Sequence, residues 1–215
     1  MHVFELLYKE FGPQNWWPAD TPFEVVVGAV LTQFVSWRNV EQAIDALKQR
    51  GLMDPEKILK VEDEILEELL KPTRFYKQKA RRLKEFCSHL VTRYNGKLEK
   101  MFSKEIDELR RELLGIKGIG PETADSIILY AAEKPVFVID AYTKRIFTRL
   151  GIFKDDVNYE EMQFYFHKHL KRDVRLFNEY HALIVTLGKT ICSDKKPKCN
   201  KCPLRETCKF PNKDG

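Results

Sequence analysis

Residues 113–140, LLGIKGIGPETADSIILYAAEKPVFVID, join a glycine-rich turn to a single carboxylate, and this stretch decides the fold. Gly115, Gly118 and Gly120 have no Cβ atoms, so the backbone can turn sharply between two helices and bring its N–H groups close to a ligand. Pro121 suits the first position of a helix whose positive end faces this turn. The stretch predicts two helices joined by a turn that can hold a phosphate, with a plain tight corner as the alternative.

The motif I-x-G-I-G-x-x-T-A, followed by V-I-D-A-Y, resembles the hairpin and catalytic-aspartate segment of helix-hairpin-helix DNA glycosylases, the endonuclease III superfamily. Residues 22–50 and 180–208 are also similar to that family, so the resemblance covers most of the chain. It implies an all-α, two-lobed fold with a C-terminal iron-sulfur cluster loop. The expected lobes are a central one over 22–133, with the helix-hairpin-helix motif at about 104–132, and a second one from 1–21 plus 134–215.

The composition is that of a globular protein with one basic end. Of the 215 residues 43% are hydrophobic, which is ample for a core, and no apolar run approaches membrane-spanning length. The formal charge of +5 arises at the C-terminus, because residues 189–215 hold eight Lys or Arg against three Asp or Glu, while the remainder holds 29 of each. This segment is either a solvated tail or a surface for a polyanion. We expect a monomeric cytoplasmic protein, nucleoid-associated if its source is a prokaryote.

Helical periodicity and end signals recur along the rest of the chain. Residues 135–139 have strand propensity, but a single strand has nothing to pair with, so we predict an extended connection. Cys87 lies alone within a helix and is expected to be a small core residue. A Pro-initiated turn and an acidic helix are predicted within 54–70, and an amphipathic helix that follows the basic residues of 73–86 is predicted to reach about residue 94. The further helices are predicted over 3–11, 22–31, 37–50, 104–114, 121–132, 141–150, 159–171 and 177–190.

A capping box predicts the start of the buried helix at Pro22, because Thr21 can cap it and Glu24 stands three residues later. The loop after this helix carries LTQ-x-x-S-W, which resembles the loop that enters the duplex in the alkyl-base subgroup of the family. Phe34 stands where that subgroup commonly has Asn. Either Gln33 or Phe34 could therefore be the wedge that fills the vacated base stack, and a buried Phe34 is equally compatible with the sequence.

Three tryptophans are candidates for a base pocket. Trp16 and Trp17 lie in GPQNWWP, which has no helical or strand pattern, and their rings could cap a core or offer a stacking platform for a nucleobase. The subgroup resembling 3-methyladenine glycosylases carries Trp-Trp-Pro at this place beside its base pocket. In the same subgroup the aromatic residue at the position of Trp37 faces the flipped base. The resemblance therefore implies a pocket formed by Trp16, Trp17, Pro18 and Trp37.

Asp140 is the candidate catalytic residue. It stands at the N-cap position of a predicted helix, where its carboxylate would accept hydrogen bonds from free N–H groups and would be kept ionised. Cleavage of an N-glycosidic bond needs such a carboxylate, either to stabilise positive charge on the sugar or to orient water. The resemblance assigns this catalytic role to Asp140 in addition to capping.

The hairpin is expected to hold the DNA backbone, and the resemblance implies contacts from Gly115, Lys117, Gly118, Gly120 and Thr123. In the bifunctional members of the superfamily the residue after G-x-G-x is a lysine that attacks the sugar. Here this residue is Glu122. A carboxylate cannot form an imine, so no lyase reaction is expected from this position.

Four cysteines near the C-terminus follow the spacing C-x6-C-x2-C-x5-C. Their density in an intracellular chain favours a metal centre over disulfides, with zinc and a [4Fe–4S] cluster as the chemical choices for four thiolates. The spacing resembles the [4Fe–4S] loop of endonuclease III and of adenine-specific mismatch glycosylases, which favours the cluster. The expected ligands are Cys192, Cys199, Cys202 and Cys208, and the basic loop they would shape against phosphates carries Lys195, Lys196 and Lys198.

The resemblance as a whole implies a monofunctional DNA glycosylase that flips a damaged base out of double-stranded DNA and hydrolyses its glycosidic bond. The aromatic pocket favours an alkylated purine such as 3-methyladenine, because a cationic base stacks well on indole. The alternatives are a glycosylase for oxidised pyrimidines, a mismatch glycosylase, and a non-catalytic DNA-binding protein.

Overall fold

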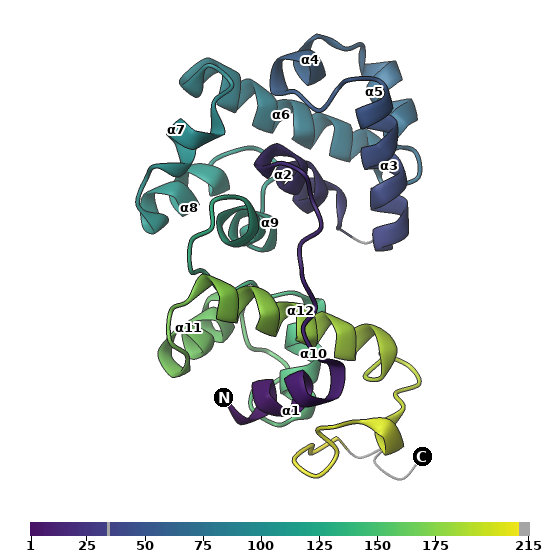
Figure 1. Ribbon diagram of the computed structural model, residues 1–215, viewed down its shortest axis with the longest axis vertical. Helices are drawn as coiled ribbons and strands as arrows, with labels where there is room; N and C mark the ends of the chain where they lie inside the picture. The colour runs from purple at the N-terminus through teal and green to yellow at the C-terminus, as the bar shows by residue number, and fades with distance from the viewer. Residues whose placement is uncertain (34, 211–215) are drawn as a thin grey trace. The chain divides into compact units, whose positions relative to one another are not determined.

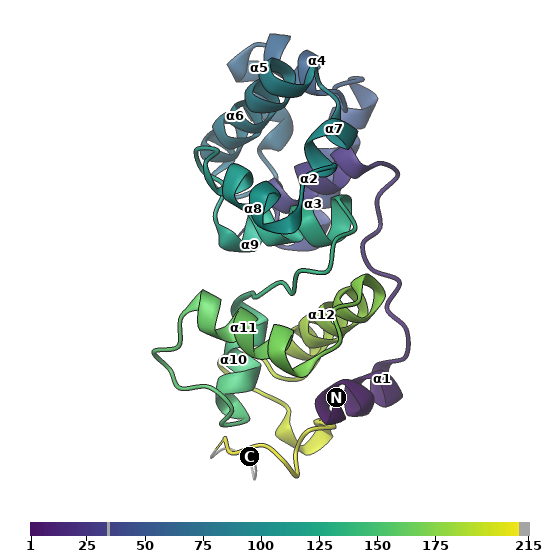
Figure 2. The same cartoon turned by 90° about the vertical axis from the view of Figure 1, so that its left-hand side faces the viewer.

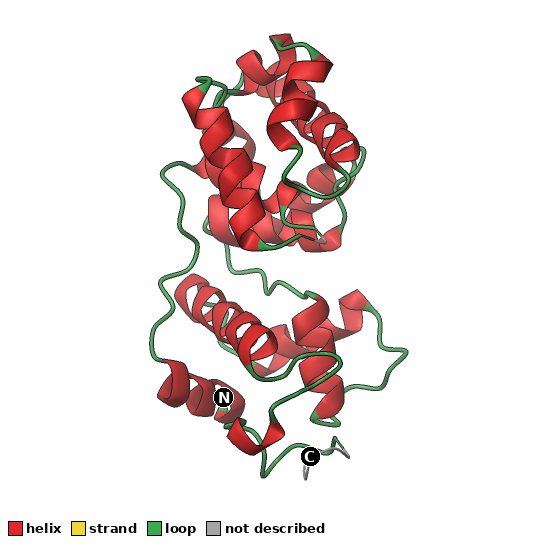
Figure 3. Ribbon diagram, turned by 90° about the vertical axis from the view of Figure 1, so that its right-hand side faces the viewer, coloured by secondary structure: helices red, strands yellow, loops and turns green. Residues whose placement is uncertain are grey.

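The computed structural model describes residues 1–33 and 35–210, and every regular element in these ranges is a helix (Figure 3). This confirms the predicted all-α class. The helices fall into two compact units, and Figure 1 labels the helices of each. We call residues 19–134 the continuous unit, and residues 1–18 together with residues from 135 onward the discontinuous unit. No helix in the described ranges is long and apolar enough to cross a membrane.

The continuous unit is built around α2 (Pro22–Leu31), which is buried over residues 23–31 because every residue of that range except Glu24 and Gly28 has an apolar side chain. Helices α3, α6, α9 and η1 pack against it (Figure 2). The remaining elements of this unit are α3 (Trp37–Gln49), α4 (Pro55–Lys60), α5 (Asp63–Leu70), α6 (Tyr76–Tyr94), α7 (Leu98–Phe102), α8 (Ile106–Leu114), α9 (Pro121–Ser126) and the π-helix η1 (Ile127–Ala131).

Two helices of the continuous unit differ from the prediction. Within residues 54–70 the predicted Pro-initiated turn is a short helix, α4, and the predicted acidic helix is α5; Val61 ends α4 with an extended backbone (φ −69°, ψ 143°). The segment predicted as one α-helix over 121–132 changes to a π-helix after Ser126, where the N–H of Ala132 donates to the carbonyl of Ile127 at 3.0 Å. This bond spans five residues and so widens the last turn.

The start of α2 confirms only half of the predicted capping box. Thr21 Oγ1 accepts a hydrogen bond from the N–H of Glu24 at 3.2 Å, as predicted. The carboxylate of Glu24 does not return a bond to Thr21; it accepts from the N–H of Asp20 at 3.0 Å and lies 2.8 Å from Lys48 Nζ on α3. A buried carboxylate needs a charged partner, and Lys48 supplies one across the helix pair.

The discontinuous unit has a core of aromatic side chains. It contains α1 (His2–Phe11), α10 (Ala141–Arg149), α11 (Tyr159–His169), α12 (Val174–Thr190) and the 3₁₀ turn η2 (Cys199–Lys201). Helix α12 packs against both α1 and α10. The ring of Phe137 stacks on Phe166 with centroids 3.9 Å apart, and Phe177 and Tyr180 meet it edge-on at 5.3 and 5.7 Å.

Residues 135–139 form the predicted extended connection, and side chains of α11 satisfy its backbone. The N–H of Phe137 donates to His167 Nε2 at 2.9 Å, and the amide of Gln163 donates to the carbonyl of Phe137 at 2.8 Å. Both backbone polar groups of the buried Phe137 are therefore hydrogen-bonded without a partner strand. The segment leads directly to Asp140.

Candidate active site and DNA interface

Asp140 is the N-cap of α10, with an extended backbone (φ −120°, ψ −179°). One carboxylate oxygen, Oδ1, accepts two hydrogen bonds from Thr143, from its N–H at 2.7 Å and from its hydroxyl at 2.8 Å. The other oxygen, Oδ2, lies 3.5 Å from Nε2 of His181 on α12. The cap fixes the direction of the carboxylate, as the sequence predicts, and leaves Oδ2 turned towards α12.

Burial and hydrogen bonding have opposite effects on Asp140, whose side chain is only 10% exposed. Burial raises the pKa of the carboxyl group, but the contacts with His181 and Thr143 lower it by more, so the net pKa lies below the usual value. Asp140 is therefore an ionised carboxylate at neutral pH in a largely dry site. Such a group is strongly attracted to positive charge that develops beside it.

His181 and Lys189 were not predicted as site residues. His181 is buried on α12, and Lys189 lies two helical turns further along the same helix. Burial lowers the pKa of the Lys189 ammonium group, and the charge of Asp140 opposes this shift only in part. Thr143 could have been found from the sequence, because it stands three residues after the cap. His181 is 41 residues from Asp140 in the chain, and only the packing of α12 on α10 brings the two together.

The loop over residues 12–18, here called the tryptophan loop, is hydrogen-bonded to α12. The N–H of Gln14 donates to Glu179 Oε1, and Thr186 donates to Gln14 Oε1, each at 2.7 Å. The half-buried rings of Trp16 and Trp17 meet edge-to-face with centroids 5.7 Å apart. Lys189 Nζ lies 5.4 Å from the Trp16 ring. Lys189 and the partners of Gln14 thus place the tryptophan loop against α12, the helix that also carries His181.

The other two predicted pocket residues have different settings. Pro18 is exposed at the end of the tryptophan loop. Trp37 is half-buried and begins α3 in the continuous unit. Trp16, Trp17 and Asp140 all belong to the discontinuous unit, whereas Trp37 belongs to the continuous unit.

The hairpin in the continuous unit consists of α8, a turn over residues 115–120, and α9. Gly118 has a φ of +90°, and a Cβ atom added to it would lie 2.4 Å from Cγ of Arg82 on α6. Glycine is needed here both for the backbone conformation and for the close approach of Arg82. Gly115, Lys117 and Gly118 are exposed, so the turn presents its backbone to solvent.

Gln33 is hydrogen-bonded at both ends of its side chain. Its Nε2 donates to the hydroxyl of Thr123 at 2.9 Å, and its Oε1 accepts from Arg82 Nη1 at 2.6 Å. Thr123 is only 2% exposed, unlike the exposed Glu122 before it. The predicted wedge Gln33 is therefore tied to the hairpin, whereas Phe34, the other candidate, lies outside the described residues.

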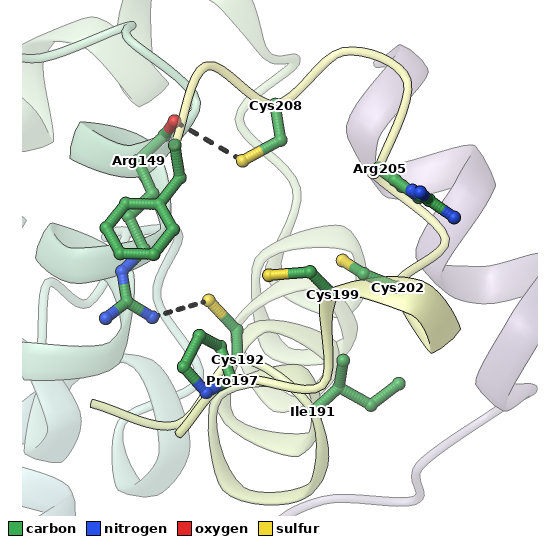
Figure 4. A pocket seen from close by; sticks show the side chains of 9 residues that line it. Arg149, Ile191, Cys192, Pro197, Cys199, Cys202, Arg205 and Cys208 are labelled. Atoms are coloured by element: carbon green, nitrogen blue, oxygen red, sulfur yellow. Dashed lines mark hydrogen bonds between the residues drawn. The ribbon is translucent and has the colours of Figure 1, made fainter. Parts of the chain in front are cut away.

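The four predicted cysteine ligands line one small pocket in the C-terminal loop, where Figure 4 shows their sulfur atoms on its inner side. Two arginines of α10 that the sequence analysis did not single out shape this loop. Arg149 donates to the carbonyls of Ser193 at 2.7 Å and Asp194 at 2.8 Å, and Arg145 donates to the carbonyl of Cys192 at 3.0 Å. Among the described residues no three His, Cys, Asp or Glu side chains are in metal-binding geometry. Lys195, Lys196 and Lys198 are exposed on the same loop.

Known proteins resemble this chain over most of its length. Residues 27–172 match the family model described as HhH-GPD superfamily base excision DNA repair protein. The chain is 48% identical over 208 residues to a Methanocaldococcus jannaschii protein provisionally named a DNA repair glycosylase, covering 96% of this chain and 94% of that one. It is 31% identical over 209 residues to endonuclease III of Thermotoga maritima, covering 97% and 92%. A solved structure of H. pylori 3-methyladenine DNA glycosylase bound to 1,N6-ethenoadenine has a TM-score of 0.77 and 28% identity, covering 87% of this chain and 96% of that one.

The chain therefore belongs to the HhH-GPD superfamily of base excision DNA repair proteins. Within that superfamily it is a DNA repair glycosylase, an enzyme that acts on DNA. This confirms the superfamily inferred from the hairpin and aspartate motifs.

The two hairpin glycines should respond differently to alanine. Gly118→Ala forces a side chain into a left-handed conformation and against Arg82, so we expect the free energy of unfolding to fall by about 1–3 kcal/mol. Gly120 has a φ of −94° and open space where a Cβ atom would lie, so Gly120→Ala should cost less than about 1 kcal/mol. Urea unfolding followed by circular dichroism measures both. Equal losses at the two positions would contradict this account of the turn.

Proposed function

We propose that this protein is a monofunctional DNA glycosylase that hydrolyses the N-glycosidic bond of an alkylated purine of the 3-methyladenine type. The observation that carries the proposal is Asp140, an ionised and largely buried carboxylate whose Oδ1 is held by Thr143 and whose Oδ2 points towards His181. Loss of a base leaves positive charge on the sugar, and a fixed carboxylate in a dry site stabilises that charge.

Each residue near Asp140 has a distinct role in this proposal. Thr143 keeps the carboxylate in one orientation, so that little reorganisation is needed as charge develops. His181 lies within reach of Oδ2 and helps to hold a water molecule or the carboxylate itself in position. Asp140 either stabilises the sugar cation directly or orients the water that attacks it, and both routes need its negative charge.

The preference for an alkylated base rests on charge. An N3- or N7-alkylated purine is cationic and a good leaving group, so it needs little acid assistance. The faces of Trp16, Trp17 and Trp37 are electron-rich, and stacking on indole would favour the cation by about 0.5–2 kcal/mol. The similarity to a 3-methyladenine glycosylase of H. pylori supports this preference, and the similarity to endonuclease III of Thermotoga maritima supports the alternative of an endonuclease III-like glycosylase.

The absence of lyase activity rests on Glu122. This residue is exposed in the first turn of α9, at the position where bifunctional members carry their nucleophilic lysine. A carboxylate cannot attack the sugar to form an imine, so base release by hydrolysis would leave an intact abasic strand.

The four cysteines of the C-terminal loop fit a [4Fe–4S] cluster in donor type and number. All four thiols line one pocket, and α10 fixes the loop that carries them through Arg145 and Arg149. When bound, a cluster would cross-link the loop through iron–thiolate bonds. The exposed Lys195, Lys196 and Lys198 would then be held in one arrangement, in which they can contact DNA phosphates.

The central test removes one charge from the proposed site. Asp140→Asn keeps an N-cap, because asparagine caps as well as aspartate, so fold and DNA affinity should be retained. Release of 3-methyladenine from methylated DNA should fall by about 100- to 1,000-fold. The matched control is Asp173→Asn, which makes the same change at the N-cap of α12 and should leave the rate unchanged.

The same assay should be run on duplexes that contain thymine glycol or a G·T mismatch. We expect both to be processed much more slowly than methylated DNA. Faster release from thymine glycol would overturn the alkyl-base assignment, while equal rates for Asp140→Asn and wild type would overturn the catalytic role of Asp140.

Borohydride trapping tests the monofunctional mechanism. Reduction during base release should give no covalent protein–DNA adduct above background, because position 122 lacks an amine. The strand should stay intact until it is treated with alkali. An adduct that forms at the rate of base release would contradict the prediction.

Metal analysis tests the cluster. Anaerobically purified protein should be brown and contain about four irons per chain, since four thiolates are available. Replacing Cys199 by Ser should reduce the iron content and the absorbance together. Colourless protein with one stoichiometric zinc would show that the four cysteines form a zinc site instead.

A further inference from the structure

The continuous unit contains a polar pocket beside α6. Its volume is about 220 Å³, and α6 with the residue before it supplies most of its wall. The lining side chains are two cations, two carboxamides and one aromatic ring, and the described lining includes no carboxylate. They are Gln33, Phe75, Gln78, Lys79 and Arg82.

Lys79 is the unusual member of this group. It is only 1% exposed, and its Nζ makes no hydrogen bond with any described residue. Burial, together with the nearby charge of Arg82, lowers the pKa of its ammonium group to about 8. A buried cation without a partner destabilises a fold, and an apolar side chain of similar length would be more stable there. Lysine at this position therefore lowers the stability of the fold, and packing alone does not explain its presence.

The pocket adjoins the hairpin. Arg82 forms part of the pocket wall, and its side chain also lies against Gly118 in the hairpin turn. Gln33, on another part of the wall, donates to Thr123 in the second hairpin helix. A strand whose backbone is held at the hairpin turn would consequently pass close to the pocket.

The lining is suited to an anion. Both cations and the amide of Gln78 can donate hydrogen bonds, and charge-assisted bonds to phosphate oxygens are the strong class. Entry is open on the side of Gln78 and Phe75, since Gln78 is exposed and Phe75 is 56% exposed. The flexible four-carbon stem of Lys79 lets its ammonium group reach a ligand in the pocket.

We propose that this pocket binds one phosphodiester group of the DNA backbone, with Lys79 and Arg82 as its cationic partners. The proposal rests on the proposed function, because it takes DNA as the ligand. The bound phosphate supplies the counter-charge that Lys79 lacks in the free protein. Lys79 therefore lowers the stability of the free protein and raises its affinity for DNA.

Two variants test the pocket from opposite sides, each with a matched control in the same unit. Lys79→Met removes the buried cation, and its control Lys60→Met removes a lysine whose side chain is 78% exposed on α4. Gln78→Glu places a negative charge at the pocket entrance, and its control Gln49→Glu adds the same charge at an exposed position of α3. Because Gln78 is exposed, Gln78→Glu folds even if Lys79→Met does not.

Affinity for a fluorescent duplex, measured over a salt series, gives the first result. Lys79→Met and Gln78→Glu should each bind roughly 5- to 20-fold more weakly at low salt. For Lys79→Met the slope of log affinity against log salt should become shallower by about 0.9, the value for one lost phosphate contact. The two controls should stay within about twofold of wild type. Thermal melting should place both pocket variants at or above wild type, which a purely structural role of Lys79 does not predict.

A scan with single methylphosphonate groups gives the second result. Neutralising one particular phosphate should weaken binding by wild type and by Lys60→Met, but not by Lys79→Met, which has already lost that contact. The inference would be overturned if both pocket variants had the affinity and the salt slope of wild type. It would also be overturned if each methylphosphonate weakened DNA binding by wild type and by Lys79→Met to the same extent. These outcomes leave base release by the wild type intact, whereas failure of wild type to release any base or bind DNA would overturn the proposed function itself.

Discussion

The candidate chemistry depends on keeping one buried carboxylate charged. Asp140 is largely dry, and burial alone would favour its neutral form. Thr143 gives it two hydrogen bonds at the start of α10, and His181 approaches from α12, so that the charged form is the stable one. The aromatic core around Phe137 and the packing of α12 on α10 fix the positions of the helices that carry these groups.

In the continuous unit, the comparable constraint is the contact between Arg82 and the hairpin turn. Gly118 permits this contact because it has no side chain, and Arg82 in turn holds Gln33 against Thr123. The loop that carries the candidate wedge is therefore joined to the element that is expected to hold the DNA backbone. Lys79 lies beside this network as a buried cation without a described partner, which is costly to the stability of the fold.

Helix caps and helix ends show which parts of the fold can be predicted from residues close together in the sequence. Thr21 and Asp140 cap helices as their positions predict, because a cap involves only residues within one turn. Local signals failed where a distant charge competed, as at Glu24, whose carboxylate pairs with Lys48 instead of completing a capping box. They also failed at the predicted Pro-initiated turn, which is the short helix α4, and after Ser126, where the helix widens.

The sequence by itself determined the all-α class, the superfamily, the hairpin and the aspartate, because each depends on short motifs and on residues close together in the chain. Only the tertiary structure decided that His181 faces Asp140, that Gln33 is bound by Arg82 and Thr123, and that Lys79 is buried without a described partner. The three contacts join residues that lie 41, 49 and 90 positions apart, and no local pattern relates them. Their proximity arises from helices that pack to bury apolar surface, and the polar contacts form where that packing leaves them within reach.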